Sequence, residues 1–112
     1  MADIRQMLVA LLGAAGYNVI TAASVPEALT LTESATPDLM LIDIRVGDYN
    51  GLQVAVRERA RGHAVPLIVM SGHHDPVLVK DAERLGAVFL LKPFDPDALL
   101  ERINLLLTEG HK

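Results

Sequence analysis

The chain has 112 residues, a formal net charge of −4 and a pI of about 5.4, which suits one acidic domain. Hydrophobic residues make up 51% and aromatic ones 4%, so the core is aliphatic, and without cysteine there is no disulfide, thiolate metal site or cysteine nucleophile. The sequence has no basic stripe of the kind that binds nucleic acid, so we expect no nucleic-acid binding. No apolar run reaches about 18 residues, so we expect no membrane span and a cytoplasmic protein.

The first predicted element is a helix that begins almost at Met1. Its apolar side chains recur at helical spacing, at Ile4, Leu8, Leu11 and Leu12. Asp3 has the spacing of an N-cap residue, and the helix is expected to stop between Gly13 and Gly16.

Four short aliphatic runs follow, at residues 17–22, 39–42, 67–70 and 88–91. Each is too short for a helix and is bounded by turn residues, which is typical of buried strands. Helices are predicted between and after them. Ser24 to Glu27 forms a capping box. Asp75-Pro76 and Asp95-Pro96 each predict an N-cap followed by proline at the first helical position. The third helix contains Arg57, Arg59 and Arg61, interrupted by Glu58, which predict a solvated face, with a partner surface as the alternative.

The resulting order is α-β-α-β-α-β-α-β-α. Nearly continuous apolar strands between helices predict an α/β fold, a doubly wound parallel sheet of four strands covered by five helices. Such sheets bind their ligands outside the C-terminal ends of the strands.

Three of the predicted strands deliver polar side chains to that edge. Asp43 follows the run 39–42, Ser71 the run 67–70, and Lys92 the run 88–91. Any one of these could be a loop residue, for example an exposed acid paired with a lysine. Together, a carboxylate nucleophile, a hydroxyl donor and an ammonium group suit phosphoryl transfer to Asp43, which would form an acyl phosphate.

The sequence resembles the response-regulator receiver domain over nearly its whole length. The resemblance is carried by motifs in the family's order: the strand 37–43 ending at Asp43, Gly51-Leu52, Ser71-Gly72, Leu85-Gly86-Ala87 and Lys92-Pro93-Phe94. Phe89 falls where the family carries its switching aromatic residue. The resemblance implies a flavodoxin-like fold and, for Lys92-Pro93, usually a cis peptide bond.

The resemblance also implies a function, which is signalling and not enzymatic. A histidine kinase or phosphotransfer protein would phosphorylate Asp43, with Lys92 and Ser71 contacting the phosphoryl group and Phe89 rotating inward. The signal would appear on the face of the last two helices, with Lys80, Arg84, Asp95 and Arg102 as contact residues. Mg²⁺ would be held by Asp43, the backbone carbonyl of Arg45 and an acidic pair. The adjacent His73 and His74 are expected to be loop residues and not metal ligands.

That acidic pair and the strand that carries it are not found in this sequence. The predicted organisation is a single receiver domain over residues 1–112, N-terminally incomplete and without an output domain. With strand order 2-1-3-4-5, the first strand's neighbours would stand about 9.5 Å apart and could not pair. The slot would have to close or be filled, because unpaired strand edges otherwise cause aggregation. One solution would be a homodimer or a strand swap through the open sheet or through the face of the last helices.

Two explanations stay open: truncation of a complete receiver, or natural divergence. With a single carboxylate for Mg²⁺, phosphorylation of these residues alone would be slow or absent. The alternative function is therefore a phosphorylation-independent, degenerate receiver that acts as a protein–protein interaction module.

Overall fold

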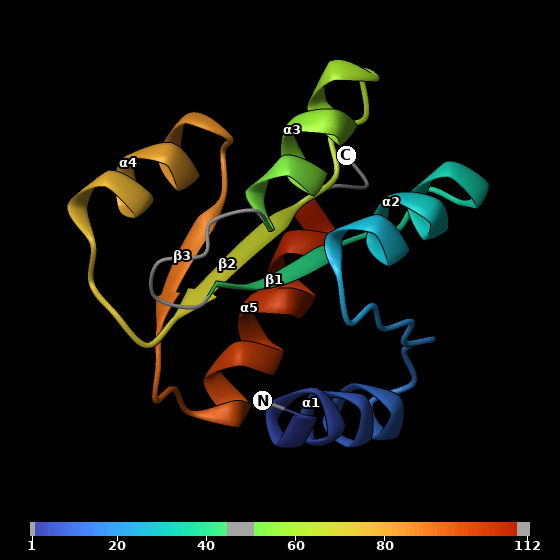
Figure 1. Ribbon diagram of the computed structural model, residues 1–112. Coiled ribbons are helices and arrows are strands. Elements are labelled where there is room, and N and C mark those ends of the chain that lie inside the picture. The colour runs from blue at the N-terminus through green and yellow to red at the C-terminus, as the bar shows by residue number, and fades with distance from the viewer. Residues whose placement is uncertain (1, 45–50, 110–112) are drawn as a thin grey trace.

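The computed structural model describes residues 2–44 and 51–109 and contains five helices and three strands in these ranges (Figure 1). The elements in chain order are α1 (Ala2–Ala14), α2 (Val25–Ser34), β1 (Met40–Ile44), α3 (Leu52–Ala60), β2 (Leu67–Ser71), α4 (Pro76–Arg84), β3 (Val88–Leu91) and α5 (Pro96–Glu109). In the described part of the chain, no helix is both long and apolar enough to cross a membrane.

The strands form one parallel sheet in the order β1-β2-β3. Asp43 lies opposite Met70, and Ser71 lies between Ile44 of β1 and Leu91 of β3. All three strands therefore run in the same direction and end at the same edge of the sheet, as the fold prediction requires. Predicted α/β architecture and parallel pairing are confirmed.

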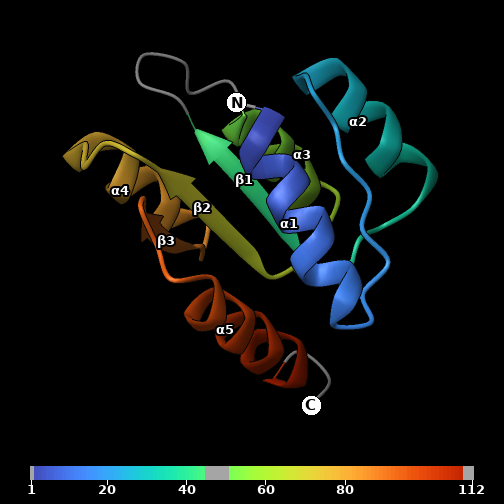
Figure 2. The same ribbon diagram turned by 90° about the horizontal axis from the view of Figure 1, so that it is seen from below.

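Alternation along the strands divides the core into two layers, since successive side chains point to opposite faces of a sheet. Even-numbered β1 residues such as Met40 and Ile44 pack with Leu67 and Val69 against α2, α3 and α4. Ile68 and Met70 of β2 pack on the other side, against α1 and α5. Figures 1 and 2 show these two groups of helices on opposite sides of the sheet.

The predicted helix starts are confirmed by their capping contacts. Asp75 and Asp95 each accept a hydrogen bond from the backbone N–H two residues ahead, with proline at the first helical position of α4 and α5. Ser24 Oγ accepts from the Glu27 N–H at 3.3 Å. The Glu27 carboxylate accepts from the Ala23 N–H, one residue before the N-cap and not at the N-cap itself.

The predicted strand at residues 17–22 is wrong. This segment is irregular and runs between α1 and α2 (Figure 1), while β1 pairs only with β2 among the described residues. A strand needs a neighbouring strand with which to form hydrogen bonds. The position between residues 17–22 and β1 is the slot that the sequence predicts to be empty, so residues 17–22 have no strand to pair with there. Tyr17 and Val19 nevertheless pack against the same core cluster as Leu39 and Leu41, so apolar contacts hold the segment in place.

Several element boundaries also differ from prediction. Helix α1 begins at Ala2, so Asp3 lies inside its first turn and is not its N-cap. Strands β1 and β2 extend to Ile44 and Ser71, because the parallel ladder continues past the aliphatic runs. Asp43 and Ser71 therefore belong to the strands and do not follow them, which fixes their backbones in the sheet.

Candidate functional site at the strand ends

Asp43 and Lys92 form the centre of the candidate site. Lys92 Nζ donates a hydrogen bond to Asp43 Oδ1 at 2.5 Å, and the two side chains are 25% and 22% exposed. Asp43 is held by β1, whereas Lys92 directly follows β3, and its peptide bond to Pro93 is cis as the resemblance implies. The sequence prediction that these two residues meet at one edge of the sheet is confirmed.

Ser71 lies at the same edge but does not contact Asp43 through its hydroxyl. Its side chain is only 1% exposed, and Ser71 Oγ donates to the His73 carbonyl and accepts from the His73 N–H, each at 3.1 Å. Its own carbonyl accepts from the Lys92 N–H at 2.8 Å, which ties the residue after β3 to the end of β2. The hydroxyl is thus engaged with its own loop.

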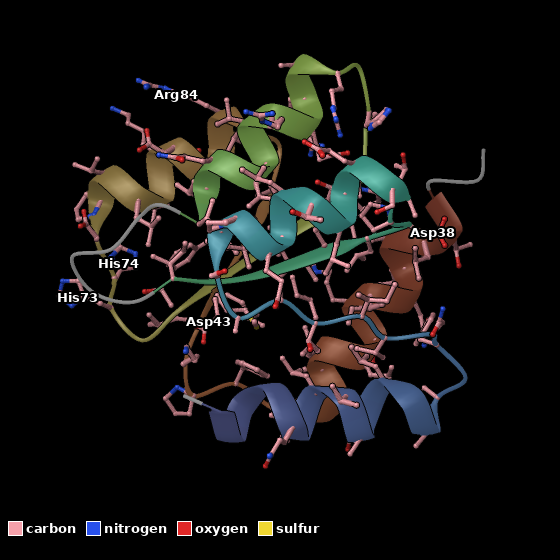
Figure 3. All side chains as sticks on the ribbon, turned by 45° about the vertical axis from the view of Figure 1, so that its right-hand side comes forward. Asp38, Asp43, His73, His74 and Arg84 are labelled. Carbon is pink, nitrogen blue, oxygen red and sulfur yellow. The ribbon has the colours of Figure 1, made fainter. Side chains whose placement is uncertain are left out.

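Phe89 is half-buried on β3, on the side of α4. Its ring meets the imidazole of His74 in a T-shaped arrangement, with 6.2 Å between ring centroids and 87° between ring planes. Figure 3 shows Asp43, His73 and His74 toward one end of the sheet and Asp38 toward the other. The predicted aromatic position is therefore close to the strand-end site.

The side chains in the described part of the chain do not form a set of ligands that fits Mg²⁺. No group of three or more histidine, aspartate, glutamate or cysteine side chains lies together there. The Asp43 carboxylate is engaged by a lysine ammonium group, and Mg²⁺ prefers a full set of oxygen ligands. Arg45, whose carbonyl is the other predicted ligand, lies outside the described residues, as does the rest of the segment 45–50.

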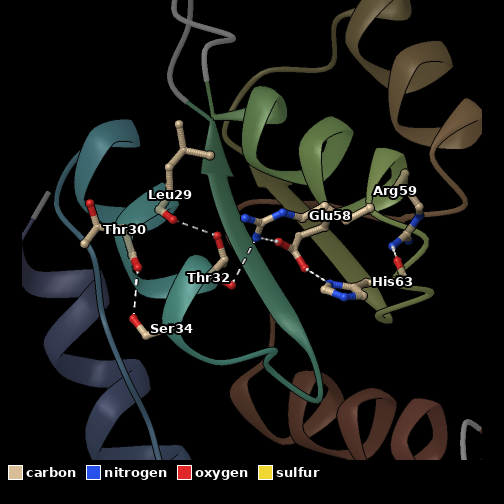
Figure 4. Close-up of polar contacts among 8 residues, drawn as sticks. Leu29, Thr30, Thr32, Ser34, Glu58, Arg59 and His63 are labelled. Carbon is tan, nitrogen blue, oxygen red and sulfur yellow. Dashed lines mark hydrogen bonds and ion pairs between the residues drawn. The ribbon is translucent and has the colours of Figure 1, made fainter.

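A polar network that the sequence did not predict lies at the C-terminal end of α3. Glu58 is 0% exposed, and its carboxylate accepts from His63 Nδ1 at 2.7 Å and from Arg61 at 3.4 Å (Figure 4). Arg61 also donates to the carbonyl of Thr32 in α2. Arg59 donates to the carbonyls of Leu85 and His63. The predicted solvated face is therefore wrong for Glu58, and two of the arginines make specific contacts.

The hydrogen bond from His63 holds the pKa of the Glu58 carboxyl below its ordinary value. Desolvation acts in the opposite direction, and Arg61 adds to the lowering. One signal in the sequence could have located this residue: Glu58 lies four positions after Val54, on the helical stripe that faces the core.

A pocket of about 240 Å³ at His63, Asp38 and Leu107 is lined by none of the strand-end residues.

Comparison with known proteins decides the family. Residues 1–104 match the response regulator receiver domain. The chain belongs to this family. It is 36% identical over 104 residues to the DNA-binding transcriptional regulator NtrC of Escherichia coli, covering 89% of this chain and 22% of that protein. With the alginate biosynthesis transcriptional regulatory protein AlgB of Pseudomonas aeruginosa it shares 36% identity over 85 residues, covering 75% of the chain and 19% of AlgB.

Solved receiver domains support the same assignment. A CheY-like receiver domain protein from Methanospirillum hungatei superimposes with a TM-score of 0.88 at 27% identity, covering 98% of this chain and 89% of that one. Chemotaxis protein CheY4 of Vibrio cholerae gives 0.80 at 29% identity, covering 95% and 91%. The predicted flavodoxin-like receiver fold is thus confirmed. The chain spans about a fifth of the length of NtrC and of AlgB.

Proposed function

We propose that this receiver domain accepts a phosphoryl group on Asp43 and signals the change through the face formed by α4, β3 and α5. The observation that carries the proposal is the 2.5 Å contact between Lys92 Nζ and Asp43 Oδ1. The lysine keeps the carboxylate at the sheet edge and offsets the negative charge that a phosphoryl group adds. A histidine kinase or a phosphotransfer protein is the proposed donor.

In the proposed reaction, a carboxylate oxygen of Asp43 attacks the phosphorus of a phosphohistidine. The P–N bond breaks, its electron pair returns to the imidazole nitrogen, and that nitrogen takes a proton from solvent. Receiver domains typically use Mg²⁺ to neutralise charge in this step, but the described donors here do not fit it. Lys92 is left as the positive charge in contact with Asp43, so we expect transfer to be slow.

The proposed signalling face is available to a partner. Lys80 and Arg84 on α4 and Arg102 on α5 are exposed, as is Asp95 just before α5. Val77 and Leu91 add exposed apolar surface to the same elements. A mixed charged and apolar surface of this kind suits a protein partner.

A second candidate function is a binding module that works without phosphorylation. Two observations on the described residues favour this binding module. These residues contain no group of side chains that fits a metal ion, and β1 pairs with another strand on one side only. An unpaired strand edge is a template for pairing with another chain. This module would self-associate or bind its partner equally well with Asp43 intact or replaced by asparagine.

The test is intact-mass measurement after incubation with acetyl phosphate, with and without Mg²⁺. The proposal expects one added phosphoryl group on the wild-type chain and none on Asp43→Asn. In this transfer the P–O bond of acetyl phosphate breaks and acetate leaves. Asp38→Asn, an aspartate at the opposite end of the sheet, is the matched control and should be labelled like the wild type. Labelling of Asp43→Asn, or no labelling of the wild type, would overturn the proposal. Sedimentation of the same variants would then test the binding module.

A further inference from the structure

Residues 6–26 are a long stretch of the sequence without a charged side chain. None of the 10 lysines and arginines and none of the 14 aspartates and glutamates lies there, although the whole chain carries a net charge of −4. The stretch comprises most of α1, the irregular segment that follows it and the start of α2 (Figures 1 and 2). All the charges of the protein are therefore carried by other parts of its surface.

Helix α1 buries only one stripe of its side chains. Leu8 and Leu12, one turn apart, are buried against β2 and α5. Met7 and Val9, on either side of Leu8, are 37% and 41% exposed, and Ala10 is exposed as well. A helix that is apolar on its outer face as well as its inner one is typically covered on both sides. The outer face of α1 is therefore a candidate interface.

The segment after α1 adds to this apolar surface. Among the large hydrophobic side chains of the described residues, Ile20 is the most exposed, at 65%. It belongs to the same charge-free stretch as Met7 and Val9, whereas the exposed Val56 on α3 is followed directly by Arg57. Single exposed apolar residues are normal, but several of them together without charges indicate a contact surface.

The absence of charge points to the kind of partner. Charged side chains of an unrelated protein would lose their hydration against α1 and find no counter-charge there, which is costly. Helices that bind membrane surfaces are rich in lysine and arginine on their polar face, and residues 6–26 contain neither. A second copy of the chain presents the same charge-free surface. Two copies that meet there bury no charge, while their like net charges disfavour contact through the other surfaces.

We propose that two copies of this domain pair through their α1 helices, antiparallel about a two-fold axis. Such an axis is the commonest symmetry of dimers and places the same patch on both sides of the interface. Pairing over the full length Ala2–Ala14 puts the axis near Leu8, so the two copies of Val9 lie close together. The inference goes beyond the proposed function, because α1 is not part of the α4, β3 and α5 face and the pairing needs no phosphoryl group.

The experiment is sedimentation equilibrium of the unphosphorylated domain over a wide range of concentration. The wild type should dimerise at high concentration and dissociate on dilution. Val9→Glu and Val9→Lys should each raise the dissociation constant about a hundredfold, because like charges then face each other across the interface. An equimolar mixture of these two variants should form a heterodimer, since opposite charges meet. Val56→Glu, at an exposed apolar position on α3, is the matched control and should dimerise like the wild type.

A wild type that stays monomeric at every concentration would overturn the inference. A dimer that persists in Val9→Glu would place the contact elsewhere, for example at the open edge of β1, and would also overturn it. The mixture serves as the folding control, because only folded variants can restore a dimer, and a mixture that stays monomeric contradicts the pairing. Asp43→Asn should dimerise like the wild type, so failure of phosphoryl labelling and failure of dimerisation are read from separate measurements.

Discussion

Lys92 reaches Asp43 across the full width of β2. Parallel strands are about 4.8 Å apart, so β1 and β3 are separated by roughly 10 Å, yet Lys92 Nζ and Asp43 Oδ1 are 2.5 Å apart. The bond from the Lys92 N–H to the Ser71 carbonyl anchors the lysine backbone at the intervening strand. The three strand ends are thus connected by one backbone and one side-chain contact.

This ion pair should make a measurable but modest contribution to stability. A double-mutant cycle with Asp43→Asn and Lys92→Met should give a coupling free energy of about 0.5–1 kcal/mol, since both side chains are partly screened by water. Urea unfolding measures it, and the coupling should shrink at high salt. A coupling of zero at low salt would show that the contact does not persist in solution.

Neutralising Glu58 should cost more than neutralising an exposed glutamate. Glu58→Gln removes a buried charge that accepts from His63 and Arg61, and should lower the free energy of unfolding by about 1–2 kcal/mol. Glu33→Gln, at an exposed position on α2, is the matched control and should change it by less than about 0.5 kcal/mol. Equal losses in the two variants would contradict a stabilising network.

The same network predicts how stability depends on pH. The pKa of Glu58 in the folded chain is lowered from its ordinary value of 4.5, so the folded state favours the ionised form. Its contribution is complete above that value and is lost as the pH falls through the lower, folded-state pKa. Unfolding midpoints measured from neutral pH to below 4.5 should therefore fall less steeply in Glu58→Gln than in the wild type. Parallel curves would rule out this origin of the acid sensitivity.

Gly51 has little space for a side chain at the start of α3. A Cβ there would lie 3.0 Å from Ile42 Cγ2 and 3.0 Å from Ile44 Cδ1, both on β1. Gly51→Ala should therefore destabilise the domain by about 1 kcal/mol, through overpacking against β-branched side chains. Gly13→Ala, in α1 with no atom within 4 Å of the added carbon, should instead stabilise it. Thermal unfolding of the pair separates a local clash from a general glycine effect.

Much of the fold could be predicted because its signals are local. Asp75 and Asp95 before proline determine helix starts, and the short aliphatic runs identify β1, β2 and β3. Residues 17–22 could form a strand only beside a neighbouring strand, and the apolar pattern of a segment does not show whether such a neighbour exists. The meeting of Asp43 with Lys92 follows from parallel topology, so the sequence could place both.

The remaining features depend on loop geometry. Glu58 is buried with a charge because the turn after α3 brings His63 back to it, and no periodic pattern encodes that return. The contact between His74 and Phe89 likewise depends on how the Ser71 hydroxyl folds the loop that leaves β2. The predicted cytoplasmic address, the kinase partner and the extent of the domain stay predictions.

The most direct test of the central claim locates the phosphoryl group itself. The domain is incubated with acetyl phosphate and then reduced with borohydride, which converts an aspartyl phosphate into homoserine. Peptide mass mapping should find homoserine in place of Asp43 in the wild type, and an unchanged peptide in Asp43→Asn. Reduction at another aspartate, or none in a folded wild-type chain, would contradict the assignment of Asp43 as the phosphate acceptor.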